Sequence, residues 1–248
     1  MKKLILTLPI IILLFASVAY ADKGMIPVNH LPIYEPSQKA VIAWNNNTEI
    51  ILLSVDLKTE NGKTKVIEVL PCIRDPNRIR LIAKLDHEIG DAIPYVALRF
   101  PPGKATYAEK EGVLTLNVYD RLITLFPEGK IAMTYTKDLD EAKEIIEEFM
   151  DLINEAYKEA VEKGREYAEE YVKRLKSINW MELYKHLPQT NCGECGEQTC
   201  AALAMKALQG EAKLSSCKPL LNDPRYAKNL KELRERLGPY LCKTLGLE

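Results

Sequence analysis

Short runs in which apolar and polar residues alternate occupy much of residues 39–135 and predict β-strands. Three early runs are separated by turn residues and predict an antiparallel meander: Lys39–Trp44, Glu49–Leu57 and Lys65–Leu70. Three later runs alternate in a way that predicts one buried face: Val113–Val118, Leu122–Phe126 and Lys130–Tyr135. The pattern therefore predicts an antiparallel, β-rich region.

Two segments between these groups of strands carry other patterns. Asp75 and Pro76 suit the N-cap and the first position of a helix, and apolar residues at helical spacing follow them. We therefore expect a short amphipathic helix over residues 76–90. Residues 95–100 lie between prolines and predict a short extended run.

A long stripe of apolar residues at helical spacing begins after the second group of strands. Asp138, with Glu141 three residues later, forms an acidic capping box at its start. The spacing predicts one helix of about ten turns over residues 138–176, weakened at Gly164. This helix would link the β-rich region to the cysteine-rich region that follows.

The start of the chain has the pattern of an export signal. Met1 is followed by two lysines, by the largely apolar run Leu4–Val18 and by Ala19–Ala21, which fits the small-x-small cleavage rule. Cleavage would make Asp22 the first residue of the mature protein. The alternative is an uncleaved membrane anchor, because residues 4–21 reach the ~18 residues of a minimal membrane span. Either alternative places the rest of the chain outside the cytoplasm.

The charge balance gives no support to nucleic acid as a partner. Lysine and arginine together number 34 and aspartate and glutamate 35, so no overall field favours nucleic acid or an anionic membrane surface. Motifs typical of hydrolases, zinc proteases and nucleotide-binding proteins are absent from the sequence. The three histidines, His30, His87 and His186, lie far apart and are assigned structural or surface roles.

Four of the six cysteines are candidate ligands of a metal centre. They are spaced C-x2-C-x4-C-x16-C and are Cys192, Cys195, Cys200 and Cys217. Four thiolates is the ligand count of a [4Fe-4S] cluster. A glycine follows each of the first two cysteines, which allows tight turns that bring backbone N–H groups near cluster sulfides. Cys200 opens a predicted helix, Ala201–Leu208, whose positive end favours a negative cluster.

Three other interpretations of these cysteines remain open from the residues alone. Zinc ribbons generally present two C-x2-C knuckles, whereas sixteen residues separate the last two cysteines here. Disulfides are common in exported chains, but the first three thiols are too close in sequence for a useful cross-linking framework. A redox-active C-x-x-C pair is expected after a βαβ pattern, and none precedes Cys192.

The stretch around these cysteines resembles the small [4Fe-4S] domain of the large corrinoid iron-sulfur subunit of acetyl-CoA decarbonylase/synthase and of the B subunit of the Rnf complex. The matching elements are Leu187-Pro188, Asn191–Gly196, Thr199-Cys200, Ala201–Leu208, Gly210-x-Ala212-x-Leu214 and Cys217-x-Pro219-Leu220. The resemblance covers residues 187–220 and implies that all four cysteines bind one cluster in a module attached to various partners. It does not extend to the reactions of those proteins.

Polar residues around the first two cysteines predict that one edge of the site is near solvent. These residues are Glu194, Glu197 and Gln198. The two carboxylates should lower the reduction potential, because negative charge disfavours the reduced, more negative cluster. The remaining cysteines, Cys72 and Cys242, are expected to be small buried apolar side chains. A disulfide between them is the alternative suggested by export.

The sequence thus predicts an α+β fold in four segments. They are a signal peptide or anchor over residues 1–21, a β-rich exported domain of unknown role over 22–137, a long amphipathic helix over 138–180 and a [4Fe-4S] domain over 181–248. We expect an electron carrier or accessory subunit rather than a stand-alone enzyme, with one-electron transfer to a protein redox partner. Membrane attachment would run through residues 4–21. The alternative is a non-redox exported binding module in which the cluster or a zinc ion is a structural staple.

Overall fold

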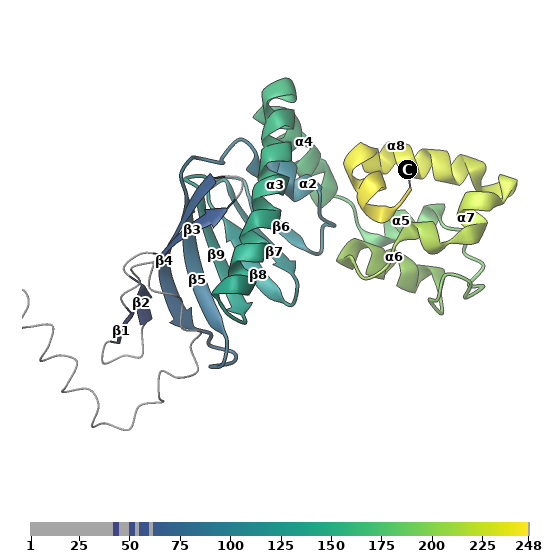
Figure 1. Ribbon diagram of the computed structural model, residues 1–248. Helices are drawn as coiled ribbons and strands as arrows, with labels where there is room; N and C mark the ends of the chain where they lie inside the picture. The colour runs from purple at the N-terminus through teal and green to yellow at the C-terminus, as the bar shows by residue number, and fades with distance from the viewer. Residues whose placement is uncertain (1–41, 45–49, 53–54, 60–61, 248) are drawn as a thin grey trace, which may run out of the picture. The chain divides into compact units, whose positions relative to one another are not determined.

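The fold is α+β, as the sequence predicted, with an antiparallel sheet followed by helices (Figure 1). The structure is a computed structural model that describes residues 42–44, 50–52, 55–59 and 62–247. The predicted signal or anchor over residues 1–21 lies outside these residues. Within the described residues, no helix combines the length and apolar character needed to cross a membrane.

The main sheet has seven strands in the order β3-β4-β5-β9-β8-β7-β6, and every neighbouring pair is antiparallel. The strands are β3 (Val55–Thr59), β4 (Gly62–Pro71), β5 (Ile79–Leu85), β6 (Ala105–Ala108), β7 (Val113–Val118), β8 (Arg121–Leu125) and β9 (Lys130–Thr136). A separate antiparallel pair consists of β1 (Ile42–Trp44) and β2 (Ile50–Leu52).

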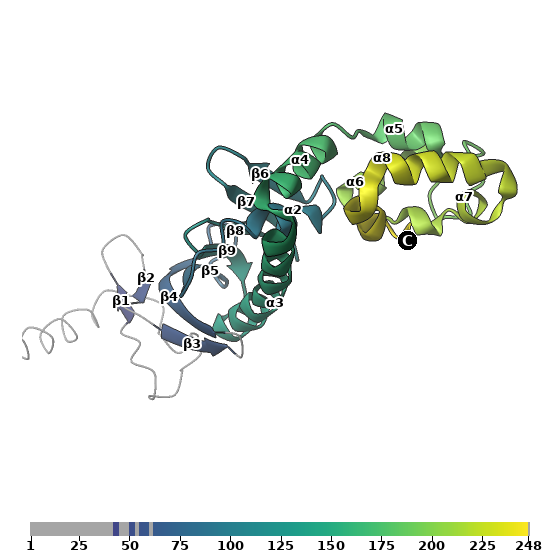
Figure 2. The same ribbon diagram turned by 90° about the horizontal axis from the view of Figure 1, so that it is seen from above.

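Helices α2 (Ile93–Leu98) and α3 (Leu139–Lys163) pack on one face of the sheet, and α4 (Arg165–Lys176) packs against α2 (Figures 1 and 2). Strands β5 and β8 bury every second residue, which forms the sheet side of the core. Helix α3 supplies the other side through Ala142, Ile146, Phe149 and Ile153, which are at most 2% exposed. The apolar stripe that predicted this helix is therefore its buried face.

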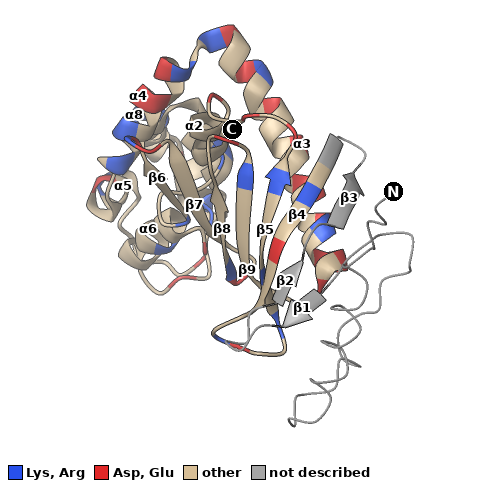
Figure 3. Ribbon diagram, turned by 90° about the vertical axis from the view of Figure 1, so that its left-hand side faces the viewer, with Lys and Arg blue, Asp and Glu red and all other residues tan. Residues whose placement is uncertain are grey.

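The opposite face of the sheet carries polar and charged residues and faces the viewer in Figure 3. Its register places Lys65 of β4 opposite Lys84 of β5, and Lys84 opposite Lys130 of β9. Like charges directly opposite each other destabilise a sheet. Glu128 offsets part of this cost, because its carboxylate lies 2.9 Å from the Lys130 ammonium and its carbonyl accepts from Lys84.

The second group of predicted strands is confirmed. The runs over residues 113–118, 122–126 and 130–135 correspond to β7, β8 and β9. The third early run lies inside β4, and the second is divided between β2 and β3. Only residues 42–44 of the first early run are described, and they form β1. The short strand β6 was not predicted.

The predicted helix over residues 76–90 is wrong, because this segment contains strand β5. Ile79, Leu81, Ala83 and Leu85 are buried and the residues between them are half-buried, so the period is two. Apolar residues three apart also fit the helical period, so the sequence pattern did not distinguish a helix from a strand here. Pairing with β4 on one side and β9 on the other decides for the strand.

The predicted extended run over residues 95–100 is also wrong, because α2 occupies Ile93–Leu98. All six of its residues are buried, so the helix has no polar face that would give a helical pattern. Pro94 lies in the first turn, where a proline is tolerated because its missing N–H has no partner there. The Tyr95 hydroxyl donates to the Gly164 carbonyl at 2.7 Å.

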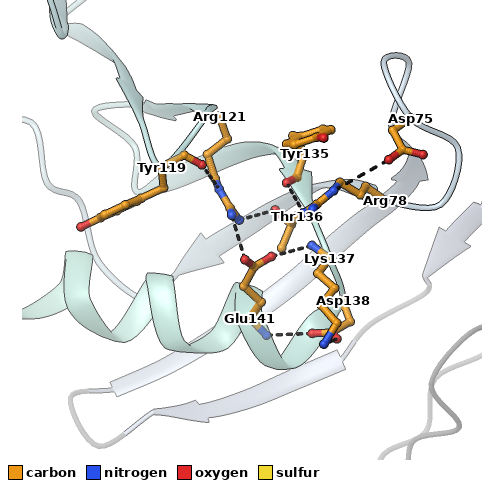
Figure 4. A network of polar contacts seen from close by, with 9 residues as sticks. All are labelled: Asp75, Arg78, Tyr119, Arg121, Tyr135, Thr136, Lys137, Asp138 and Glu141. Carbon is orange, nitrogen blue, oxygen red and sulfur yellow. Dashed lines mark hydrogen bonds and ion pairs between the residues drawn. The ribbon is translucent and has the colours of Figure 1, made fainter. Parts of the chain in front are cut away.

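The predicted long helix is divided into α3 and α4 at Gly164. Its φ of 81° and ψ of 153° lie in a region that is almost restricted to glycine. The predicted start is confirmed, since the Asp138 carboxylate accepts from the Glu141 N–H at 2.9 Å. Glu141 also anchors the helix to the sheet, because its Oε1 accepts from Arg121 Nη2 at 2.8 Å (Figure 4). The pKa of Glu141 is lowered, first by this hydrogen bond.

The C-terminal part is helical and has its own apolar interior. It comprises α5 (Trp180–His186), α6 (Cys200–Gln209), α7 (Lys218–Asn222) and α8 (Ala227–Leu245), with short 3-10 turns at Leu214–Ser216 and Pro224–Tyr226. The predicted helix over residues 201–208 is confirmed as α6. Leucines fill the interior and are at most 2% exposed: Leu183, Leu187, Leu203, Leu214, Leu220 and Leu233. The Tyr240 hydroxyl of α8 donates to the Glu159 carboxylate of α3 at 2.6 Å.

Cys72 and Cys242 are both buried, as expected, with exposed fractions of 7% and 6%. Neither is in a disulfide, so the alternative of a bond between them is wrong for this structure. The two sulfurs are in different parts of the fold, since Cys72 follows β4 and Cys242 lies in α8.

Candidate metal centre

The fold brings the four predicted ligands together from separate positions in the C-terminal part. Cys192 and Cys195 lie in the loop between α5 and α6, Cys200 is the first residue of α6, and Cys217 directly precedes α7. The pKa of the Cys217 thiol is raised, first by burial and then by the other three cysteines. Because electrostatic interactions weaken with distance, this effect indicates that the other three thiols lie in the neighbourhood of Cys217.

Two glycines shape the loop that carries the first two cysteines. Gly193 and Gly196 have φ values of 76° and 87°, in the left-handed region that glycine adopts without strain. The Gly196 N–H donates to the Gly193 carbonyl at 3.0 Å, which closes a tight turn around Cys195. A Cβ at either glycine would meet nothing within 4 Å, so backbone conformation rather than space favours glycine there.

Cys200 is held at the positive end of α6. The Thr199 hydroxyl accepts from the Ala202 N–H at 3.0 Å and caps the helix. The side chain of Asn191, in the preceding loop, accepts from the Cys200 N–H itself at 2.9 Å. The helix dipole therefore favours negative charge next to this thiol.

The four cysteines differ strongly in exposure. Cys200 and Cys217 are 5% and 3% exposed, Cys195 is half-buried and Cys192 is exposed. A surface hollow adjoins Cys192 and is lined by the loop before α6, by α7 and by the 3-10 turn that follows it, through residues that include Glu194, Lys218, Asp223 and Tyr226. The site is thus enclosed on the side of α6 and α7 and open at Cys192.

The polar edge predicted from the sequence is present, with one correction. Glu194 and Gln198 are exposed. Glu197 is not a solvated charge, because its carboxylate forms an ion pair with Lys206 of α6 at 2.9 Å and its side chain is 18% exposed. The expected negative charge at this edge therefore comes from Glu194, while Lys206 offsets Glu197.

The thiol arrangement fits an iron-sulfur cluster. In a cluster each cysteine binds its own iron, so the sulfurs surround the group instead of meeting at one atom. Four gathered thiols, the glycine turns beside two of them and a helix N-terminus at a third meet the needs of such a group. No three His, Cys, Asp or Glu side chains in the described part of the chain are placed to bind a single metal ion.

Comparison with known proteins agrees with this assignment. Residues 187–219 match a protein-family model described as "Putative Fe-S cluster". The chain is 54% identical over 68 residues to the gamma 1 subunit of the acetyl-CoA decarbonylase/synthase complex of Methanosarcina thermophila. It is 45% identical over 64 residues to the gamma subunit of Methanocaldococcus jannaschii, and 54% identical over 46 residues to the large subunit of the corrinoid/iron-sulfur protein of Moorella thermoacetica.

These similarities concern a limited part of each protein. The first match covers 27% of this chain and 14% of the relative, and the Moorella match covers 18% and 10%. No solved structure matches the chain. The C-terminal part of the chain therefore contains an iron-sulfur cluster-binding domain related to those of these subunits.

Sequence reasoning missed two contacts that support the site. Asn191 bonds to Cys200 across nine residues, and Glu197 pairs with Lys206 across nine residues. Neither spacing is a helical one, so no periodicity predicts them. The one available signal was the position of Asn191 in a loop with glycines, since asparagine is also frequent in the left-handed region.

Proposed function

We propose that this chain is an exported or membrane-anchored iron-sulfur protein that binds one [4Fe-4S] cluster and transfers single electrons to a protein partner. The ligands would be Cys192, Cys195, Cys200 and Cys217. The observation that carries the proposal is the gathering of these four thiols, of which Cys192 is the one exposed to solvent.

The residues present support each part of the cofactor assignment. A [4Fe-4S] cluster supplies reversible one-electron chemistry and takes four cysteine thiolates. Cys200 and Cys217 would hold the enclosed side, where both belong to the buried apolar core. The α6 N-terminus and the turns at Gly193 and Gly196 provide positive backbone dipoles beside a negative group.

A protein partner is supported by the open edge of the site. Electrons pass most readily where the cofactor is near the surface, and Cys192 provides that position beside its hollow. The gamma relatives are named as subunits of a complex. We therefore propose a partner that docks at the Cys192 edge, and we carry over neither the partners nor the reaction of those complexes.

The extracytoplasmic location is proposed from the sequence of residues 1–21 alone. Two lysines, an apolar run and Ala19–Ala21 have the features of a secretory signal. The lysines are not the twin arginines associated with export of folded proteins. The cluster would then be inserted after export, which requires a location with little oxygen.

Anaerobic purification followed by iron and sulfide analysis tests this proposal. We expect about four iron and four sulfide per chain, and a reversible one-electron reduction to a paramagnetic state in voltammetry and electron paramagnetic resonance. Stoichiometric zinc without labile sulfide would contradict the cofactor. A cluster that decomposes whenever it is reduced would contradict electron transfer and support a structural staple.

A further inference from the structure

We propose that Asn191 is a positioning residue of the metal centre that holds the Cys200 amide and thereby affects both cluster retention and reduction potential. This inference rests on the proposed function, because it takes Cys192 and Cys200 as ligands. Asn191 is not itself a ligand.

The bond between Asn191 and Cys200 connects two of the proposed ligands directly. Asn191 precedes Cys192 in the chain, and its Oδ1 accepts from the backbone N–H of Cys200 at 2.9 Å. One side chain thus ties the start of the exposed loop to the buried Cys200 at the start of α6. Before any cofactor binds, this contact restricts how far Cys192 can move from Cys200, and such preorganisation lowers the entropic cost of binding.

Helix capping alone does not account for this contact. The cap of α6 is Thr199, whose hydroxyl already accepts from Ala202. Asn191 satisfies a further N–H of the first turn from a residue outside the helix, nine positions earlier. What the contact adds is therefore a connection between the loop and the helix.

The backbone at this position explains why the residue is an asparagine. Its φ is 51°, in the left-handed region that asparagine tolerates better than most residues other than glycine. Glycine would fit this backbone but has no acceptor. Aspartate would fit the backbone and keep the acceptor while adding a charge. Substitution can thus separate the need for a left-handed backbone from the need for a hydrogen-bond acceptor.

The same bond has a consequence for the reduction potential. An N–H that donates to Asn191 is not available to a cysteine sulfur. Hydrogen bonds to sulfur are among the factors that set the potential of a cluster, and they favour the reduced, more negative state. By holding the Cys200 N–H, Asn191 keeps the potential lower than it would otherwise be.

The test compares Asn191→Gly and Asn191→Asp with Gln189→Gly in the full chain. Gln189 is a matched control, because it is exposed, has a φ of 58° in the same loop and contacts the Tyr184 carbonyl instead of a ligand. We expect Asn191→Gly to lose iron to a chelator about three- to ten-fold faster than wild type, the effect of one lost hydrogen bond, with a higher potential. Asn191→Asp should retain iron within about two-fold of wild type and have a lower potential.

Two further measurements separate this inference from the proposed function. In the metal-free protein, hydrogen exchange of the Cys200 amide should be slow in wild type and Asn191→Asp and faster in Asn191→Gly. The role of Asn191 would be overturned if the Cys200 amide exchanged at the wild-type rate in Asn191→Gly. It would also be overturned if Asn191→Gly and Gln189→Gly had the same rate of iron loss and the same reduction potential. Cys200→Ser should lose the cluster outright; full iron retention in that variant would remove Cys200 from the ligand set and overturn both proposals.

Discussion

At the scale of single residues, Cys217 and Cys242 show how similar burial can serve different roles. Both lie in the C-terminal helical part and are at most 6% exposed. Cys217 is affected by three other thiols, whereas the Cys242 sulfur donates to the Arg234 carbonyl at 3.6 Å. Environment, and not exposure, therefore distinguishes the proposed ligand from a buried apolar cysteine.

Replacing Cys217 with serine should remove or destabilise the cluster, although sixteen residues separate Cys217 from Cys200. A serine hydroxyl remains protonated near neutral pH and is a much weaker iron ligand than a thiolate. Iron and sulfide per chain measure the effect. Cys242→Ser is the matched control and should keep the wild-type iron content. Equal iron in both variants would show that Cys217 is not a ligand.

Replacing Glu194 with glutamine should raise the reduction potential. Glu194 is exposed beside Cys195, and removing its charge makes the reduced state less unfavourable. We expect a shift of roughly 10–30 mV at low salt, which voltammetry resolves. Glu111→Gln, at an exposed position in the sheet part, is the control for change of net charge. Shifts of the same size in the two variants would contradict a local effect.

At the scale of elements, the start of α3 is fixed to the sheet by charge. Arg121 of β8 is 7% exposed in its side chain and contacts Glu141 of α3 at 2.8 Å. Its guanidinium also donates to the Tyr119 carbonyl at 3.1 Å (Figure 4). A buried guanidinium that loses its carboxylate is strongly unfavourable, so Glu141 matters more than an exposed residue of the same helix.

Glu141→Gln should lower the free energy of unfolding by about 1–3 kcal/mol at pH 7. The pKa of Glu141 is lowered in the folded state, so its stabilising effect is complete above its unfolded pKa. The effect is lost as pH falls through the lower, folded pKa. Thermal unfolding should therefore show a difference between wild type and variant that narrows below about pH 4. Glu144→Gln, one turn away and exposed, should behave like wild type.

The junction of α3 and α4 depends on one glycine. Gly164→Ala should destabilise the fold by about 1–3 kcal/mol, because alanine is strained at this backbone conformation. The strain lies in the local backbone and not in a tertiary contact, since a Cβ there meets no atom beyond the adjacent residues within 4 Å. Gly90→Ala is the control, because its φ is not positive and its nearest contact would be an ordinary 3.5 Å. Equal denaturation midpoints for the two variants would contradict the prediction.

At the scale of the whole molecule, the main prediction concerns where the chain is located and where the mature protein starts. Mass spectrometry of protein from its native source should find an N-terminus at Asp22, because Ala19–Ala21 fits the cleavage rule. An intact Met1 in the membrane fraction would favour the anchor. A soluble product in the cytoplasm would contradict both alternatives. The four-segment division of the chain also stays a prediction.

Local patterns in the sequence were sufficient to predict several helices and strands and the kind of metal site. Alternation over residues 113–135 predicted β7, β8 and β9, because one face of each strand is buried. The apolar stripe after Asp138 predicted the helical segment that contains α3 and α4, because each of these helices buries one face. The spacing of four cysteines, with glycines beside two of them, pointed to a cluster because ligand chemistry is carried by residue type and spacing.

The tertiary structure decided what these local patterns leave open. Residues 79–85 fit two periods, and hydrogen bonding to β4 and β9 selects the strand. All six residues of helix α2 are buried, so its sequence lacks the alternation of apolar and polar faces that predicts a helix. The exposure of Cys192, the burial of Cys217 and the Asn191 contact to Cys200 depend on how distant segments meet. Such contacts lack a fixed spacing along the chain, which is why the sequence alone does not determine them.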